Sequence, residues 1–221
     1  MKERGHRRKI GGGLADISER QISEILAIYG VRASFGLCTQ IREYIALLLA
    51  WNRQISLTAI RNAEEIVRFH FGESFFARKA VPVENGRLAD VGSGAGFPGV
   101  PLAMACSRLD LTLIEPNQKK ATFLLEVVRA LALQNVRVLR RRIEDFGRGR
   151  AEFDFITARA LGQYQSLIGW ASHSLAETGK LILWIGEANA QVVAREPAWF
   201  WREPKRIPGS RHRVLLVGSP K

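Results

Sequence analysis

The stretch Asp90-Val91-Gly92-Ser93-Gly94-Ala95-Gly96 decides the fold of this chain. It overlaps a short apolar run, Arg87 to Val91, that predicts a β-strand, and Pro98 follows shortly after it. Proline is favoured at the first position of a helix, because its missing N–H would have no partner there. Glycines in such a strand-to-helix turn let the backbone approach a ligand without a Cβ in between. The stretch therefore predicts a nucleotide-cofactor loop.

The sequence downstream of the loop continues to alternate between strands and helices. Further short apolar runs predict strands at 111–114, 136–139, 153–157 and 180–185. Amphipathic segments between them predict helices, one capped by Asn117 and one over residues 161–175. This alternation predicts an α/β fold with a parallel sheet and helices on both faces. At the end of the chain, residues 199–206 and 213–217 predict an antiparallel hairpin at the sheet edge.

Helices are expected before the loop. Ser18 to Gln21 have the spacing of a capping box, and apolar residues then recur at the helical period. A second amphipathic stripe runs from Leu37 to Leu49, and a third helix begins at Asn62, with Glu65 as its reciprocal cap. The chain is therefore divided into a flexible basic tail (1–15), an N-terminal helical extension (16–84) and a Rossmann-like core with a C-terminal β-hairpin (85–221).

The composition is that of a globular protein with a strong positive charge. Of the 221 residues 47% are hydrophobic, and 33 Lys and Arg against 21 Asp and Glu give a net charge of +12. Such a field attracts polyanions, so we expect a nucleic-acid partner; a basic surface that serves only solubility is the alternative. No apolar run approaches the roughly 20 residues that cross a bilayer, so no membrane partner is expected.

The cysteines indicate the compartment. Cys38 and Cys106 are the only two, and each lies in an apolar stretch. They have neither the pattern of a disulfide framework nor the spacing of a zinc site. Two buried thiols suit a reducing environment, so we expect a cytoplasmic protein without a bound metal.

Two cofactors compete for the loop, whose backbone contacts would be Gly92, Gly94 and Gly96. Residues 94–99 also fit the G-x-G-x-x-G pattern of dinucleotide sites, and Glu115 lies 21 residues after Gly94, about where a ribose-binding carboxylate is expected. One interpretation is therefore a NAD-dependent oxidoreductase. The other is a methyltransferase that uses S-adenosylmethionine.

Three features favour S-adenosylmethionine. Asp90 can face the positively charged amino-acid end of this cofactor and would repel a pyrophosphate. Asp90, Glu115 and Glu144 lie 25 and 29 residues apart, the period of a βαβ unit, which places them on one edge of the sheet. Glu115 can bind the ribose hydroxyls there, and Ile143 and Glu144 can flank the adenine. Finally, Phe97-Pro98 fills the turn where a pyrophosphate would need open backbone.

The loop also resembles a known family. Its continuation from Asp90 to Leu102 is similar to the signature of the RsmG (GidB) family, bacterial methyltransferases that modify N7 of a guanine in the 530 loop of 16S ribosomal RNA. The similarity extends over nearly all the chain after the tail, in residues 51–52, 57–61, 68–74, 142–146, 157–160 and 211–213. It implies a class I methyltransferase fold with S-adenosylmethionine as cofactor.

The resemblance also implicates individual residues. The family's cofactor contacts fall on Gly92, Phe97, Ile143, Glu144 and Arg159. Members commonly have Asp in the place of Glu73, and many have a Lys-Gly pair where this chain has Trp184-Ile185-Gly186. A contact of that lysine with RNA is therefore not expected here. The partner implied is 16S ribosomal RNA or the small-subunit particle, and the protein is expected to be a monomer.

The motifs that are absent agree with N7 chemistry. The chain has no Asn/Asp-Pro-Pro-aromatic loop after the fourth strand, which methylation of an exocyclic amine usually needs, and no cysteine after a proline, which a pyrimidine carbon needs. Guanine N7 carries an exposed lone pair, so catalysis can rest on positioning and electrostatics. A protein of this fold that only binds RNA remains an alternative.

Basic residues near the loop are candidates for positioning and RNA contact. Arg159, after the fourth strand, is expected to position the cofactor or the target base; an ion pair with Glu144 or Glu115 is the alternative. The candidates for RNA contact are Arg61, Arg68, His70, Arg211, His212 and Arg213. His70 could equally be a structural histidine within its apolar helix. Of Arg140, Arg141 and Arg142, at least one is expected to face the flanking helices.

Overall fold

The computed structural model describes residues 15–146, 152–160, 162 and 164–221. The tail predicted for residues 1–15 therefore lies, except for Ala15, outside the described residues. The predicted start of the helix at residue 161 lies outside them as well.

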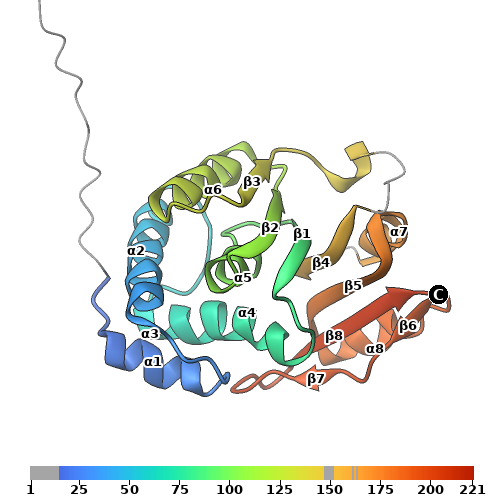
Figure 1. Ribbon diagram of the computed structural model, residues 1–221, viewed down its shortest axis with the longest axis horizontal. Helices are drawn as coiled ribbons and strands as arrows, with labels where there is room; N and C mark the ends of the chain where they lie inside the picture. The colour runs from blue at the N-terminus through green and yellow to red at the C-terminus, as the bar shows by residue number, and fades with distance from the viewer. Residues whose placement is uncertain (1–14, 147–151, 161, 163) are drawn as a thin grey trace, which may run out of the picture.

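One twisted sheet forms the centre of the molecule (Figure 1). Its strands are β1 (Asn85–Val91), β2 (Arg108–Ile114), β3 (Val136–Leu139), β4 (Phe153–Arg159), β5 (Leu175–Gly186), β6 (Trp199–Trp201), β7 (Lys205–Arg206) and β8 (Arg213–Pro220). The order is β3-β2-β1-β4-β5-β8-β6, with β7 paired to β8. Strands β1 to β5 are parallel, whereas β8 runs antiparallel to β5. The order reverses at β1, so the carboxyl ends of β1 and β4 flank the crevice where open α/β sheets bind ligands.

The predicted strands and hairpin are confirmed with adjusted limits. Residues 199–206 form two short strands, β6 and β7, and both pair with β8 in antiparallel register. The hairpin thus ends the sheet as expected, but its long strand β8 lies inside the sheet between β5 and β6.

The helices are α1 (Glu19–Ala27), α2 (Phe35–Trp51), α3 (Ala63–Ile66), α4 (Glu73–Phe76), α5 (Gly99–Ala105), α6 (Gln118–Ala130), α7 (Tyr164–Ser174) and α8 (Glu187–Val193). Side chains of Ser18, Asn62 and Asn117 cap α1, α3 and α6 as predicted. Pro98 is the N-cap residue of α5 rather than its first helical residue. The pattern did not predict α8. Shorter turns are η1 (a π-helix, Val67–Gly72), η2 (Ala77–Lys79) and η3 (Ile143–Phe146), the last two being 3-10 helices.

Each face of the sheet has its own hydrophobic core, because successive strand residues point to opposite faces. On β5, Ile182 and Trp184 face the core that holds α1, α2, α5 and α6, whereas Leu183 and Ile185 face the core that holds α7 and α8. Figure 1 shows the N-terminal helices (blue to cyan) beside α5 and α6. The helices before β1 therefore share one core with the sheet; their description as a separate extension stays a prediction.

A column of aromatic rings joins the glycine loop to the N-terminal helices. Phe97 stacks between Tyr44 of α2 and His70 of η1, with ring centroids 5.2 and 4.7 Å apart. Phe71 meets Phe97 edge-on at 5.2 Å. The Tyr44 hydroxyl donates to the carbonyl oxygen of Ala95 at 2.5 Å. Contacts from the N-terminal helices therefore hold the glycine loop in its conformation.

We predict that Phe97→Ala destabilises the protein by about 3–5 kcal/mol, because a buried ring in contact with three others is replaced by a cavity. Urea unfolding followed by circular dichroism measures this change. Phe200→Ala is the matched control, since Phe200 is 63% exposed and its loss should change stability by no more than about 0.5 kcal/mol. Equal effects of the two substitutions would contradict the role of the column.

Candidate functional site

The glycine loop adopts a backbone that other residues rarely adopt. Gly92, Gly94 and Gly96 have φ angles of +67°, +54° and +86°, all in the left-handed region. A Cβ on Gly96 would collide with the Tyr44 hydroxyl, whereas a Cβ on Gly94 would meet only the carbonyl oxygen of Gly92, at 3.7 Å. Gly96 is thus needed for packing beneath the loop. Gly94 has open space above it.

Asp90 lies beneath the loop and is fully buried. Its Oδ1 accepts a hydrogen bond from Thr157 of β4 at 2.8 Å, and its Oδ2 accepts one from the backbone N–H of Gly99 at 3.3 Å. Burial raises the pKa of Asp90 to about 7, against the opposing effect of these hydrogen bonds. The carboxyl group therefore joins β1, β4 and the start of α5, and it does not line the cavity described next.

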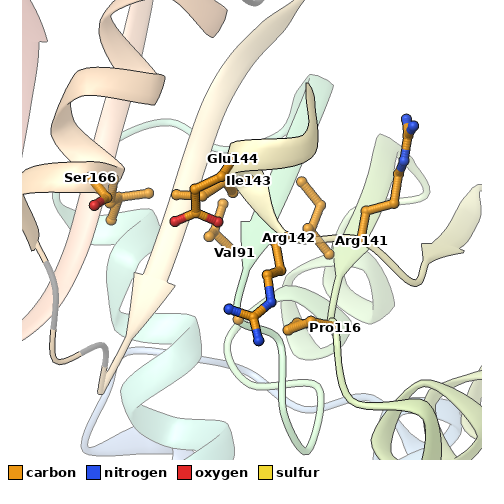
Figure 2. A pocket seen from close by; sticks show the side chains of 10 residues that line it. Val91, Pro116, Arg141, Arg142, Ile143, Glu144 and Ser166 are labelled. Carbon is orange, nitrogen blue, oxygen red and sulfur yellow. The ribbon is translucent and has the colours of Figure 1, made fainter. Parts of the chain in front are cut away.

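A cavity of about 290 Å³ lies at the carboxyl ends of β1 and β2. Its walls include the predicted cofactor residues Gly92, Ile143 and Glu144, together with residues of the first turn of α7. In Figure 2 the Glu144 carboxylate and the Arg142 guanidinium group extend to the same side, whereas Arg141 points away from them. The cavity thus combines an apolar wall with a carboxylate at its rim.

Glu115 connects the loop to α6. Its Oε2 accepts from the backbone N–H of Gly94 and its Oε1 from that of Asn117, each at 2.8 Å. The side chain is buried, so two of its acceptor positions already serve the protein. Its predicted contact with ribose stays a prediction.

Arg159 belongs to a buried ion cluster with Glu73 and Arg213. Nη2 of Arg159 lies 3.2 Å from Oε2 of Glu73, and Nη2 of Arg213 lies 2.7 Å from Oε1. Glu73 has no exposed surface, and the side chains of Arg159 and Arg213 are 10% and 39% exposed. Burial raises the pKa of Glu73, and the two guanidinium groups act in the opposite direction. The suggested ion pair of Arg159 with Glu144 or Glu115 is wrong; the partner is Glu73.

His70 lies on the face of the sheet that packs against the N-terminal helices, where its ring contacts Phe97. Its Nε2 is 2.8 Å from the hydroxyl of Thr58, and its ring stacks on Phe97. Burial, followed by the nearby charges of Arg159 and Arg213, lowers the pKa of His70 to about 3. The ring is therefore neutral near pH 7, so any contact with RNA would not involve a positive charge.

The other candidates for RNA contact lie at different depths. Arg61, Arg211 and His212 are exposed, and Arg68 is partly buried. Arg213 pairs in register with Gly186 at the carboxyl end of β5, on the same sheet edge as the loop. Arg140, Arg141 and Arg142 follow the end of β3 and are all exposed, so the expectation that one faces the flanking helices is wrong.

A comparison with protein families places this chain. The model for the family described as rRNA small subunit methyltransferase G (GidB) matches residues 37–207. The chain belongs to this family.

Individual relatives agree with the match. The methyltransferase G family includes the ribosomal RNA small subunit methyltransferase G of Xylella fastidiosa (strain 9a5c), 40% identical over 179 residues that cover 78% of this chain and 83% of that protein. The protein of the same name from Stenotrophomonas maltophilia (strain K279a) is 39% identical over 199 residues, covering 87% and 92%. A SAM dependent methyltransferase from Aquifex aeolicus shares the fold, with a TM-score of 0.57 and 16% identity over 66% of this chain and 88% of that one. The predicted Rossmann-like methyltransferase fold is confirmed.

The structure of this methyltransferase G family member assigns a role to residues that the sequence analysis did not single out. Glu73 was noted only as a conservative change, and Tyr44 and Thr157 were given no role of their own in the site. A signal for Glu73 was present, since a carboxylate within the apolar run from Ile66 to Phe76 must find a partner if that run is buried. The identity of that partner, some 140 residues away at Arg213, could not be obtained from the pattern.

We predict that Gly96→Ala destabilises the protein more than Gly94→Ala. Both substitutions force alanine into the left-handed region, at a cost of about 1–2 kcal/mol. Only Gly96→Ala adds a collision with Tyr44, which costs about 1–3 kcal/mol more. Denaturant unfolding of the two variants measures the difference. A larger loss for Gly94→Ala would contradict the packing role of Gly96.

We predict that Asp90 makes stability depend on pH. Its pKa rises from 3.8 to about 7 on folding, so the folded state binds the proton more tightly than the unfolded state. The stabilisation is complete below about pH 4 and is lost as the pH rises through 7. Between pH 5 and pH 8 the wild type should therefore lose about 2.5 kcal/mol relative to Asp90→Asn. Urea unfolding of both proteins at the two pH values tests this, and a constant difference would contradict it.

Proposed function

We propose that this chain transfers the methyl group of S-adenosylmethionine to N7 of a guanine in the 530 loop of 16S ribosomal RNA. The observation that carries the proposal is the family match over residues 37–207, which includes the whole glycine loop and the cavity beside it. The predicted cofactor residues Gly92, Ile143 and Glu144 meet in that cavity.

The residues present fit S-adenosylmethionine. Ile143 offers an apolar surface and Glu144 an acceptor to an adenosine in the cavity. Nη1 of Arg159 is buried and has no hydrogen-bond partner among the described residues, so it can donate to an oxygen of the amino-acid end of the cofactor or of the target base. Buried donors of this kind are normally satisfied, and a bound carboxylate or carbonyl group would satisfy this one.

The geometry disfavours a dinucleotide. In a dinucleotide-binding fold the pyrophosphate sits on the free backbone N–H groups at the start of the helix after the glycine loop. Here the N–H of Gly99 at the start of α5 already donates to the buried carboxylate of Asp90. A second anion at this position would face Asp90. The oxidoreductase alternative is therefore weaker than the methyltransferase.

The chemistry asks little of the protein beyond positioning. The bound cofactor supplies an electrophilic methyl group on a sulfonium. Guanine N7 attacks with its own lone pair, so no side chain has to remove a proton. Arg159 positions a reactant through Nη1, and the Cβ position of Gly94 is uncrowded. Neutral His70 adds no charge beside a base that becomes positive.

The basic surface supports RNA as the substrate. Arg141 and Arg142 lie at the cavity, and Arg211 and Arg213 lie at the start of β8, on the same edge of the sheet. Arginines can contact the phosphates of a folded RNA and hold a looped-out guanine near the cofactor. We propose that the protein acts as a monomer in the cytoplasm, on 16S RNA or the small-subunit particle. In the described ranges no helix is both long and apolar enough to cross a membrane.

We predict that purified protein methylates one guanine of unmethylated 16S RNA or small-subunit particles. Borohydride reduction and aniline cleavage break RNA at N7-methylguanine, so primer extension locates the base.

Arg159→Ala should lower the single-turnover rate on the order of 100-fold, because a misplaced reactant costs about that much. Glu144→Ala should weaken binding of S-adenosylhomocysteine about 10- to 100-fold, the loss expected for a charged hydrogen bond.

The control for these variants is Arg20→Ala, which removes an exposed i,i+4 ion pair with Glu24 on α1 and should keep both values. Binding of RNA without any methyl transfer would favour the silent RNA-binding alternative. Binding of NAD but not of S-adenosylhomocysteine would favour the oxidoreductase. Transfer to a base outside the 530 loop would contradict the proposed target.

A further inference from the structure

The buried ion cluster fixes how Arg159 can bind a ligand. Its Nη2 donates to the carbonyl oxygen of Phe69 at 2.8 Å and lies 3.2 Å from Oε2 of Glu73. The first contact is a hydrogen bond and the second is an ion pair, since Oε2 of Glu73 accepts no hydrogen bond from the described residues. Nη1, by contrast, is buried and has no partner among the described residues. Nη2 is thus engaged by other residues of the protein, whereas Nη1 is available to a ligand.

Glu73 is well placed to impose this division. Its carboxylate has no exposed surface, and its two oxygens face two arginines from different strands, Arg159 of β4 and Arg213 of β8. The indole N–H of Trp184 in β5 donates to the backbone carbonyl of Glu73 at 2.7 Å, which anchors the residue independently of its carboxylate. Without the carboxylate, Arg159 would be a buried charge with no ion pair and would reorient.

We propose that Glu73 is a positioning residue for methyl transfer: it holds Nη2 of Arg159, so that Nη1 is the terminal nitrogen that donates to an oxygen of the bound reactants. The proposal rests on the proposed function, since it concerns the same site. The oxygen acceptor is a carboxylate or carbonyl oxygen, supplied by the amino-acid end of the cofactor or by O6 of the target guanine.

The different environments of Nη1 and Nη2 matter because arginine usually binds guanine with two nitrogens, one donating to O6 and one to N7. Both edges of the guanidinium that can do this, Nη1 with Nη2 and Nε with Nη2, include Nη2. If Arg159 were free, either edge could engage N7 and occupy the lone pair that must attack the methyl group. With Nη2 held by Glu73 and Phe69, neither edge can engage guanine with both of its nitrogens, so N7 is left unblocked.

The charge of Glu73 acts in the same direction. Methylation at N7 leaves a positive charge on the guanine ring. Two guanidinium groups nearby oppose that charge, and the carboxylate between them offsets part of their field. A neutral side chain of the same shape would lose both effects, whereas a shorter carboxylate would keep the charge.

A double-mutant cycle tests the proposal. The proteins are wild type, Glu73→Gln, Arg159→Ala and the double variant, each assayed for single-turnover transfer to 16S RNA, binding of S-adenosylhomocysteine and thermal stability. Glu73→Gln should lower the transfer rate on the order of 100-fold. If Glu73 acts through Arg159, the double variant should be no slower than Arg159→Ala, within about threefold. Losses that multiply would overturn the proposal, and so would a wild-type rate in folded Glu73→Gln.

Two further variants separate positioning from folding. Glu73→Asp keeps the charge and should recover the rate to within about tenfold of wild type, since geometry is disturbed less. Leu181→Ala removes a fully buried side chain from the core on the opposite face of the sheet; it should lower thermal stability and keep the rate. A loss of rate in Leu181→Ala equal to that in Glu73→Gln, at a similar loss of thermal stability, would show that Glu73 matters only for folding.

If Glu73→Gln does not fold, Arg159→Lys tests the same division without touching Glu73. Lysine has one nitrogen, which the carboxylate would hold, so Arg159→Lys should be as slow as Arg159→Ala. A fast Arg159→Lys would overturn the proposal. The binding measurements identify the acceptor: weaker binding of S-adenosylhomocysteine in Glu73→Gln points to the cofactor, and unchanged binding with slow transfer points to guanine O6. A wild type that transfers no methyl group would refute the proposed function instead.

Discussion

The structure depends on a carboxylate that has no contact with solvent. Glu73 is stable inside the protein only because Arg159 and Arg213 approach it from the ends of β4 and β8, since an unpaired buried charge would cost several kcal/mol. The pairing fixes the N-terminal helices against the sheet at the edge where the glycine loop lies. The aromatic column of Tyr44, Phe97 and His70 reaches the same loop from the same helices. The helices that precede the sheet therefore contribute to both the ion cluster and the support of the loop.

A second buried acid, Asp90, has a different environment and a different role. It has no ion pair among the described residues and relies on hydrogen bonds from Thr157 and the Gly99 N–H, and its pKa is accordingly raised to about 7 by burial. Glu73 forms ion pairs with two arginines and holds them in place. Asp90 instead joins β1, β4 and the start of α5 through hydrogen bonds. The prediction that Asp90 faces the cofactor assumed an exposed carboxylate. The carboxylate is fully buried and joins elements of the fold, and its contact with the cofactor stays a prediction.

Features set by neighbours in the sequence could be predicted, and features set by distant contacts could not. The caps at Ser18, Asn62 and Asn117 depend on backbone groups within three residues, so local spacing was sufficient. The meeting of Gly92 with Ile143 and Glu144 in one cavity followed from the βαβ period. The partner of Arg159 could not be predicted in this way, because the sequence does not distinguish Glu73, Glu115 and Glu144 as possible ion-pair partners. The packing of η1 and α4 on the sheet brings Glu73 to Arg159. The exposure of Arg140 to Arg142 was missed for a related reason, since β3 ends at Leu139 and the alternation of a strand no longer applies.

Under the proposed function, the arrangement would also let an arginine assist a reaction at guanine N7. An unrestrained guanidinium is among the best ligands for that atom and would compete with the methyl group for the same lone pair. A site without any cation would lose a strong donor for orienting the reactants. Holding one nitrogen of Arg159 on Glu73 and Phe69 retains the donor and removes the competing grip. Under the proposal, the buried ion cluster would make the basic site of this family member compatible with attack by N7, because it limits what Arg159 can bind.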